Sequence, residues 1–231
     1  MRSRRAPVFL SIEEPSETNS QEVPPSKEVL MQILHRFVGS IQQYIEQISD
    51  PDICRPDHCP LCGVLQILIS WGFYHRTLVD LEFDGSIPVR RYRCGFCRRT
   101  VSVLPEFVLP YLRFSLLTIS LFLVARLLNG GTLKAAAQAA SQPNMPYQRG
   151  QFWIRRFRAQ AMALCSALVS RTAAISAATF VTRALQMLQK VGWISAHRFL
   201  FSELRLHLLG WPRSLAPAGI ACKLQPVEAK T

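Results

Sequence analysis

Hydrophobic residues recur every three or four positions between Lys27 and Ile48, at Val29, Ile33, Phe37, Ile41, Ile45 and Ile48. This period is that of an amphipathic helix, and Ser26, directly after two prolines, is a suitable N-cap. We therefore expect a helix over residues 26–49 that ends before Asp50-Pro51. Its apolar stripe is expected to pack on the same chain, with partner binding or a coiled coil as the alternative.

A second hydrophobic segment, residues 111–128, is apolar almost all round. Its uncharged run between Arg113 and Arg126 has only 12 residues, which is too short to cross a bilayer. We expect a buried core helix here and no membrane partner. Asn129-Gly130-Gly131 follows, and these residues can supply the left-handed backbone with which helices commonly end.

Two more helices are predicted after this stop. Thr132 can cap an alanine-rich helix from Leu133 to about Ser141, and the two prolines of residues 142–146 break it. The other helix is expected from Tyr147 through at least Ser170. Projection of this helix places Trp153, Phe157, Gln160, Leu164 and Leu168 on one face, and Gln148, Gln151, Arg155 and Arg158 on the opposite face. The arrangement is typical of a helix-turn-helix, although the expected turn is longer than the usual turn of about three or four residues.

Between these helical regions the pattern changes to that of β-strands. Val64 to Ser70 is aliphatic, Phe73 to Val79 mixes aromatic and polar residues, and Val89 to Arg93 alternates. Asp84-Gly85-Ser86 is the expected turn of a hairpin. A closing strand is expected from Thr100 to Leu104, ended by the proline that follows.

Two Cys-x2-Cys pairs flank the hairpin. Cys59 and Cys62 are followed, after a gap of 31 residues, by Cys94 and Cys97. Each pair lets a tight turn present two sulfurs, and two such turns complete a tetrahedral structural zinc site. Gly63 and Gly95 are suited to the positive φ that such turns need. We therefore predict a four-cysteine zinc ribbon over residues 50–110, with a gap longer than in the simplest two-pair pattern.

Disulfides and redox chemistry are the alternatives for these cysteines. Disulfides would need an exported chain, but Arg2, Arg4 and Arg5 precede only a short apolar patch, unlike a signal peptide. A redox dithiol is not usually present in two matched copies beside strands. We therefore expect zinc and a cytoplasmic location. Cys54 and His58, just before or beside the first pair, are expected to be surface residues.

The charge of the chain is unevenly distributed. Residues 1–84 carry 7 Lys and Arg against 12 Asp and Glu, a net charge of −5, whereas residues 85–231 carry 20 against 3, a net charge of +17. The second half is therefore the part expected to bind a polyanion. The length of 231 residues and the hydrophobic content of 49% are enough for a real core.

The residues expected to contact double-stranded DNA fall into two groups. The first group crowds the second cysteine pair without an intervening acid and suits a phosphate backbone: Arg90, Arg91, Arg93, Arg98 and Arg99. The helical group comprises Lys134, Arg149, Gln151, Arg155, Arg156 and Arg158. Arg155 and Gln151 can pair with base edges, whereas Arg149 and Arg156 suit phosphates. Solvated charged faces are the alternative for both groups.

Several of these segments together resemble a known family. Cys59-Pro60-Leu61-Cys62-Gly63, Trp71 to Arg76, Val89 to Cys94 and Arg99 to Pro105 look like the zinc-ribbon proteins associated with bacterial insertion elements, which include a transposase-like domain family. Members place such a ribbon before a helix-turn-helix. The resemblance covers roughly residues 55–160. It implies four metal ligands and DNA binding in a mobile-element or regulatory setting, not an activity.

A metal-dependent transposase would need three carboxylates around two divalent ions. After residue 85 the acids are only Glu106, Glu203 and Glu228. The earlier hairpin acids Asp80, Glu82 and Asp84 are too local for such a site and are expected to face solvent. We therefore expect no catalytic residues in this chain, which would act as a recognition or regulatory subunit.

The predicted fold class is α+β, a small zinc ribbon with four cysteine ligands followed by a mostly α-helical, helix-turn-helix-like domain over residues 111–174. A disordered arm, residues 1–25, is expected before the first helix, and a helical extension with a flexible tail is expected over residues 175–231. The expected partners are double-stranded DNA and either a catalytic transposase subunit or a second copy of the chain. A zinc-ribbon scaffold that binds another protein, or a transcriptional regulator, is the alternative.

Overall fold

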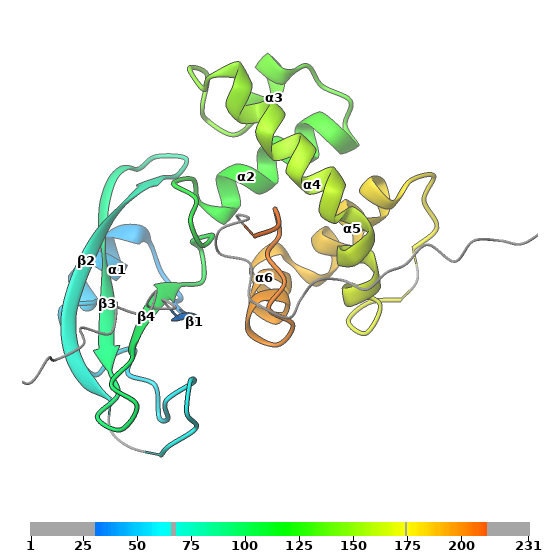
Figure 1. Cartoon of the computed structure of the whole chain (residues 1–231). Coiled ribbons are helices and arrows are strands. Elements are labelled where there is room, and N and C mark those ends of the chain that lie inside the picture. The colour runs from blue at the N-terminus through cyan, green and yellow to red at the C-terminus, as the bar shows by residue number, and fades with distance from the viewer. Residues whose placement is uncertain (1–30, 66–67, 174, 212–231) are drawn as a thin grey trace, which may run out of the picture.

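The computed structural model describes residues 31–65, 68–173 and 175–211. In this part of the chain the fold is mixed α/β, with a four-stranded sheet beside a group of helices (Figure 1). The strands are β1 (Met31–His35), β2 (Ile69–Val79), β3 (Asp84–Arg93) and β4 (Thr100–Pro105). The helices are α1 (Ile41–Gln47), α2 (Leu116–Leu123), the π-helix η1 (Val124–Leu128), α3 (Leu133–Ala139), α4 (Tyr147–Leu168), α5 (Phe180–Val191) and α6 (Trp193–Ser202). The expected arm, residues 1–25, and the chain from residue 212 lie outside the described residues.

The sheet has the strand order β1-β4-β3-β2. β2 and β3 form a long antiparallel hairpin, β4 returns antiparallel to β3, and β1 pairs in parallel with the other edge of β4. The predicted strands after residue 73 are confirmed, whereas among the described residues of the segment predicted from Val64, only Ile69 and Ser70 belong to a strand. The predicted turn at residues 84–86 is wrong. Asp84 already begins β3, because the turn is made by residues 80–83, where the Asp80 N–H donates to the Phe83 carbonyl (2.7 Å).

The predicted helix over residues 26–49 is wrong in its first part. Met31–His35 is a strand whose backbone groups pair with β4, and the expected N-cap lies outside the described residues. The helix begins only at Ile41. Ser40 caps it, since its hydroxyl accepts from the Gln43 N–H (3.2 Å) while the Gln43 side chain accepts from the Ser40 N–H (2.8 Å). Pairing with β4 has therefore prevailed over the local helical period.

Two buried tyrosines connect the sheet to α1 and the segment that follows it. The Tyr44 hydroxyl donates to the Pro88 carbonyl (2.9 Å), and the Tyr92 hydroxyl donates to the Pro51 carbonyl (2.7 Å). The Tyr92 hydroxyl also lies 3.3 Å from the Cys54 sulfur. Cys54 is therefore a core residue and not the surface residue predicted, whereas His58 is exposed as predicted.

The long helix α4 is the centre of a second core. Four of the five residues predicted on its apolar face are fully buried, namely Trp153, Phe157, Leu164 and Leu168, and Gln160 is half-buried. The Trp153 ring lies edge-on to Phe114 and Phe122, with ring centroids 4.9 and 5.2 Å away. These aromatic contacts join α4 to α2 and to the residues just before it.

The helix boundaries follow local capping. The predicted helix over residues 111–128 starts later, because Ser115 caps α2 by accepting from the Thr118 N–H (3.0 Å). Its predicted stop is confirmed, with a φ of 71° at Gly130, and Thr132 caps α3 as predicted by accepting from the Ala135 N–H (3.1 Å). No helix in the described ranges is both long enough and apolar enough to cross a bilayer.

The segment after β4, which includes Val108 and Pro110, joins the two cores and is held by residues of the C-terminal helical extension. Nε2 of His197, in α6, lies 3.3 Å from the Val108 carbonyl, and Nε2 of His207 lies 3.0 Å from the Pro110 carbonyl. Nδ1 of His207 also accepts from the Leu209 N–H (3.1 Å), so the neutral ring carries its proton on Nε2. Burial lowers the pKa of His197 to about 3 and the pKa of His207 to about 4.

An ion pair lies in the same junction. The Arg198 guanidinium is 2.6 Å from the carboxylate of Glu106, which is only 3% exposed. Glu106 directly follows β4, and Arg198 is in α6, so the pair joins the end of the sheet to the last helix. The junction is therefore fixed by two histidines and one ion pair rather than by apolar packing alone.

We expect the free energy of unfolding to fall as the pH falls below about 6.5. The folded protein keeps both junction histidines neutral, whereas the unfolded chain binds a proton on each between the ordinary pKa and the lowered folded values. Each proton contributes a slope of up to about 1.4 kcal/mol per pH unit. Urea unfolding followed by tryptophan fluorescence at several pH values between about 7.5 and 5 measures this slope.

The variant His207→Gln isolates the histidine contribution, because glutamine can keep a donor near the Pro110 carbonyl but does not titrate. Its slope is expected to be shallower than that of the wild type, whereas His75→Asn, at an exposed position, should keep the wild-type slope. Protonation of the cysteines affects all three proteins alike. Identical slopes for His207→Gln and the wild type would contradict the assignment.

Candidate metal centre and basic surfaces

The two cysteine pairs occupy turns with the same backbone pattern. In the first turn the Gly63 N–H donates to the Cys59 carbonyl (2.8 Å), and in the second the Arg98 N–H donates to the Cys94 carbonyl (3.0 Å). The residue after the second cysteine has a positive φ in both turns, 72° at Gly63 and 58° at Arg98. The prediction for Gly63 is confirmed. In the second turn, however, Arg98 and not Gly95 adopts the left-handed conformation.

The four thiols converge where these turns meet. The Sγ atoms of Cys59 and Cys97 are 3.8 Å apart, as are those of Cys62 and Cys94, and all four lie within 4.8 Å of one another. Four sulfurs arranged tetrahedrally about 2.3 Å from a zinc ion would be about 3.8 Å apart. The four predicted cysteines therefore form a group that can hold a metal ion, and their spacing is consistent with zinc.

The backbone around the second turn favours a thiolate. The N–H groups of Cys97 and Phe96 interact with the Cys94 sulfur and lower the pKa of its thiol to about 7. Since the thiolate is the form that binds a metal, Cys94 is prepared for coordination near neutral pH.

The structure separates the five arginines predicted beside the second turn. Arg98 and Arg99 are exposed, and Arg91 and Arg93 are half-buried. Arg90, in contrast, is only 4% exposed. Its guanidinium donates to the Ile48 carbonyl (2.6 Å) and to the Ser70 hydroxyl (3.1 Å), and it stacks 4.0 Å from the centre of the Phe73 ring. Arg90 therefore stabilises the fold, and its buried guanidinium leaves little surface for the predicted contact with DNA.

The helical group divides in the same way. Four of its cations are exposed, Lys134, Arg149, Arg155 and Arg158. Gln151 is half-buried, and its side-chain amide donates to the Tyr147 hydroxyl (2.9 Å). Arg156 donates to the carbonyls of Leu209 (2.6 Å), Gly210 (2.6 Å) and Trp211 (2.7 Å). Arg156 thus fixes the segment after α6, and its predicted contact with phosphate would have to compete with these three bonds.

These two sets of exposed cations lie far apart. The cysteine turns are at the end of the β2–β3 hairpin where β3 stops, at the bottom of Figure 1, whereas α3 and the start of α4 are at the top. One short stretch of nucleic acid would not contact both sets. The chain therefore has two separate basic surfaces, one at the metal centre and one on α3 and α4.

Carboxylates of the second half are engaged with arginines. Glu106 pairs with Arg198, and both oxygens of Glu203 accept from Arg171 (3.0 Å each). The third acid, at position 228, lies outside the described residues.

The hairpin acids differ from one another. Glu82 and Asp84 are exposed, as predicted, and Asp84 lies 3.3 Å from the Arg113 guanidinium. Asp80 does not simply face solvent, because its carboxylate accepts from the hydroxyls of Ser115 and Thr118 at the start of α2. It therefore helps to join the hairpin turn to the helices.

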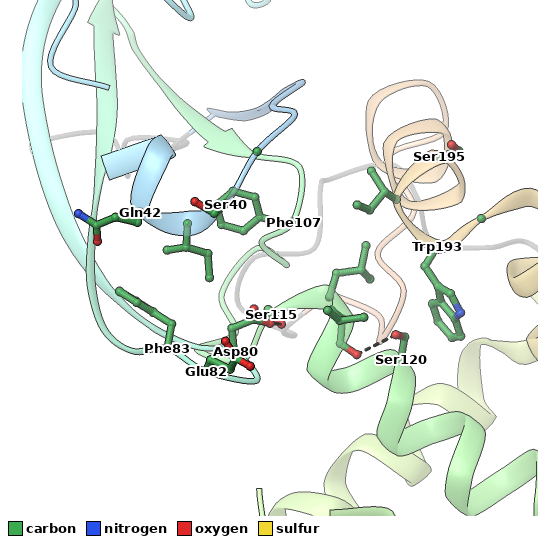
Figure 2. Close-up of a pocket in the computed structure, with 16 residues that line it drawn as sticks. Ser40, Gln42, Asp80, Glu82, Phe83, Phe107, Ser115, Ser120, Trp193 and Ser195 are labelled. Carbon is green, nitrogen blue, oxygen red and sulfur yellow. Dashed lines mark hydrogen bonds between the residues drawn. The ribbon is translucent and has the colours of Figure 1, made fainter. Parts of the chain in front are cut away.

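A cavity of about 830 Å³ lies between the sheet and the helices, beside the contacts that join them. Its wall comes from the starts of α1, α2 and α6 and from the hairpin turn (Figure 2). Phe83, Phe107 and Trp193 give it an apolar lining, and its charged groups among the described residues are the carboxylates of Asp80 and Glu82. Since none of these described lining residues is cationic, the cavity does not suit a phosphate.

The fold and the site define a mixed α/β protein with a four-cysteine cluster able to hold a metal ion. Residues 59–141 match a family model described as a domain of unknown function (DUF6431). The matched range begins at the first metal-ligand candidate, contains all four cysteines and ends just after α3. No curated protein and no solved structure matches the chain.

Sequence reasoning missed the exposure of an aromatic side chain near the second cysteine turn. Trp71, in β2, is 48% exposed although it lies in a strand-like apolar segment. The adjacent Gly72 was a signal for this, because glycine within a strand often marks a bulge that redirects a neighbouring side chain. The structure also places Arg93 over the Trp71 ring, 4.6 Å from its centre.

Substitution of one ligand tests the metal centre. Cys94→Ser is expected to lose bound zinc and to unfold the hairpin end, because the free energy of binding a structural metal is also free energy of folding. Metal content per chain and far-ultraviolet circular dichroism measure the two effects. Cys165→Ser is the matched control, since Cys165 lies in the helical core and donates to the Phe180 carbonyl (3.3 Å), which serine can also do. Unchanged zinc content in Cys94→Ser would exclude this site.

Proposed function

We propose that this chain is a zinc-dependent DNA-binding protein of mobile-element type. In this proposal residues 50–110 form a zinc ribbon, and residues 111–174 form a helix-turn-helix-like unit that contacts double-stranded DNA. The exposed cationic face of α3 and α4 is the observation that carries the proposal.

The order of helices supports DNA contact through α4. α3 and α4 are consecutive helices joined by residues 140–146, a turn longer than the usual one, and α4 buries one side against α2 while Arg155 and Arg158 remain exposed on the other. Neither helix contains an acidic residue. A helix with this division can lie in a major groove, where guanidinium groups donate to guanine and to phosphates.

The individual residues would have different roles. Arg155 and Arg158 lie on the exposed face of α4 and are suited to base edges, whereas Lys134 and Arg149, near the start of each helix, are suited to phosphates. Gln151 is available for a base only if its bond to the Tyr147 hydroxyl breaks. Arg156 and Arg90 have no part in this proposal because backbone carbonyls hold them.

We further propose recognition or regulation rather than catalysis. In the described part of the chain, the group suited to metal binding consists of four thiols, and these suit a structural zinc ion rather than the hydrated ions of phosphodiester chemistry. Glu106 and Glu203 are paired with arginines. A catalytic transposase subunit, or a second copy of the chain, would then complete the assembly that acts on DNA.

Binding of labelled duplex DNA across a salt series tests the proposal. The affinity is expected to fall steeply as salt rises, because each neutralised phosphate releases counterions. Arg155→Ala should reduce discrimination between sequences by about 1–3 kcal/mol, whereas Arg149→Ala should weaken all sequences alike and make the salt dependence shallower. The sequences to compare come from selection of tight binders from a random duplex pool.

Lys190→Ala provides the matched control. It removes one exposed cation from α5, outside the proposed surface, and is expected to leave both affinity and salt dependence nearly unchanged. If all three variants behave alike, the assignment of α4 fails. If the wild type with zinc bound does not bind duplex DNA at low salt, duplex recognition fails; if it binds no DNA at all, a protein-binding scaffold is favoured.

A further inference from the structure

Trp71 lies at an irregular point of the hairpin. The register of β2 against β3 shifts between Ser70 and Phe73, and Gly72 within the shift has a φ of 83°. Trp71 is 48% exposed there, although an indole ring gains considerable free energy from burial. A bulge that holds a large aromatic side chain in solvent is typical of a ligand-binding position.

Arg93 holds the ring from one side. Its guanidinium lies 4.6 Å from the centre of the Trp71 ring, and its Nε donates to the Arg98 carbonyl (3.3 Å). Arg98 belongs to the second cysteine turn, so the metal centre and the indole are connected through Arg93. This cation–π contact orders the ring while leaving much of its surface exposed.

The two strands and the second cysteine turn beside Trp71 carry cationic and apolar side chains. Neither β2 nor residues 85–105 contain an aspartate or glutamate, whereas Arg98 and Arg99 are exposed in the adjoining turn. Ile69, which pairs with Arg93 across the hairpin, is 54% exposed and extends the apolar surface. The ligand that complements this surface carries repeated negative charges together with flat apolar groups.

We propose that Trp71 and Arg93 form a stacking site for an unpaired base of single-stranded nucleic acid, with Arg98 and Arg99 on its phosphates. This inference rests on the proposed function as a DNA-binding protein and adds a second site to it. A base inside a duplex is already stacked on both faces and cannot stack on Trp71, whereas an unpaired base can. The site is distinct from α3 and the start of α4, which lie at the top of Figure 1, whereas β3 ends near the bottom.

Binding of fluorescein-labelled oligothymidine about 12 nucleotides long tests the site, with the zinc-loaded full chain as the protein. Trp71→Ala is expected to weaken this binding about fivefold or more, and Trp71→Phe to restore much of it, because stacking on one aromatic ring is removed and then partly replaced. The affinity of Trp71→Ala for the selected duplex should stay within about twofold of the wild type. Zinc content and circular dichroism establish that each variant is folded.

Phe180→Ala is the matched control, since Phe180 is 52% exposed but lies at the start of α5, outside both proposed surfaces. It should leave oligothymidine binding unchanged. Equal binding of oligothymidine by the wild type and Trp71→Ala would overturn the inference. So would a wild type that binds the duplex but not oligothymidine. Neither result would contradict duplex recognition by α4. If the wild type binds oligothymidine but not the duplex, and Trp71→Ala loses that binding, this site would be supported and duplex recognition by α4 would be overturned.

Discussion

Four sulfur atoms within 4.8 Å of one another constrain everything at the hairpin end of this protein. As thiolates they would repel one another strongly. A metal cation at their centre attracts all four, and this attraction outweighs the repulsion. One turn precedes β2 and the other follows β3, so both lie at the same end of the antiparallel hairpin, and the sulfur cluster closes β2 and β3 at that end. Trp71, Arg93 and the exposed arginines of the second turn take their positions from this closure.

Arginine has two opposite uses in this fold, and the exposed fraction of its side chain separates them. Arg90 and Arg156 donate to backbone carbonyls of segments far away in the sequence, which satisfies acceptors that no regular element pairs. Arg155 and Arg158 lie in the same helix as Arg156, but their side chains are exposed. The net positive charge of the second half thus overstates the charge that a polyanion can reach.

The parts of the structure that depend on neighbouring residues were predictable, and those that depend on distant ones were not. The cysteine cluster, the apolar face of α4 and the cap at Thr132 follow from spacing and local hydrogen bonding. β1 exists because β4, about 70 residues later in the sequence, offers an edge, and no local pattern carries that information. The same holds for Arg90 and Arg156, whose partners are decided by tertiary packing. The helical period of residues 26–49 was misleading because it ran through a strand, the Ser40 cap and a short helix.

The junction between the two cores has a consequence for geometry. His197, His207 and Arg198 each attach the connecting residues to the C-terminal extension, so the sheet and the helices are tied by contacts beyond a single covalent linker. A flexible linker would let the sheet and the helices adopt many separations, whereas these contacts keep them at one separation. If both proposed sites bind nucleic acid, the junction fixes the distance between them. The protein is then expected to bind most tightly to nucleic acids in which a paired and an unpaired region are separated by that distance.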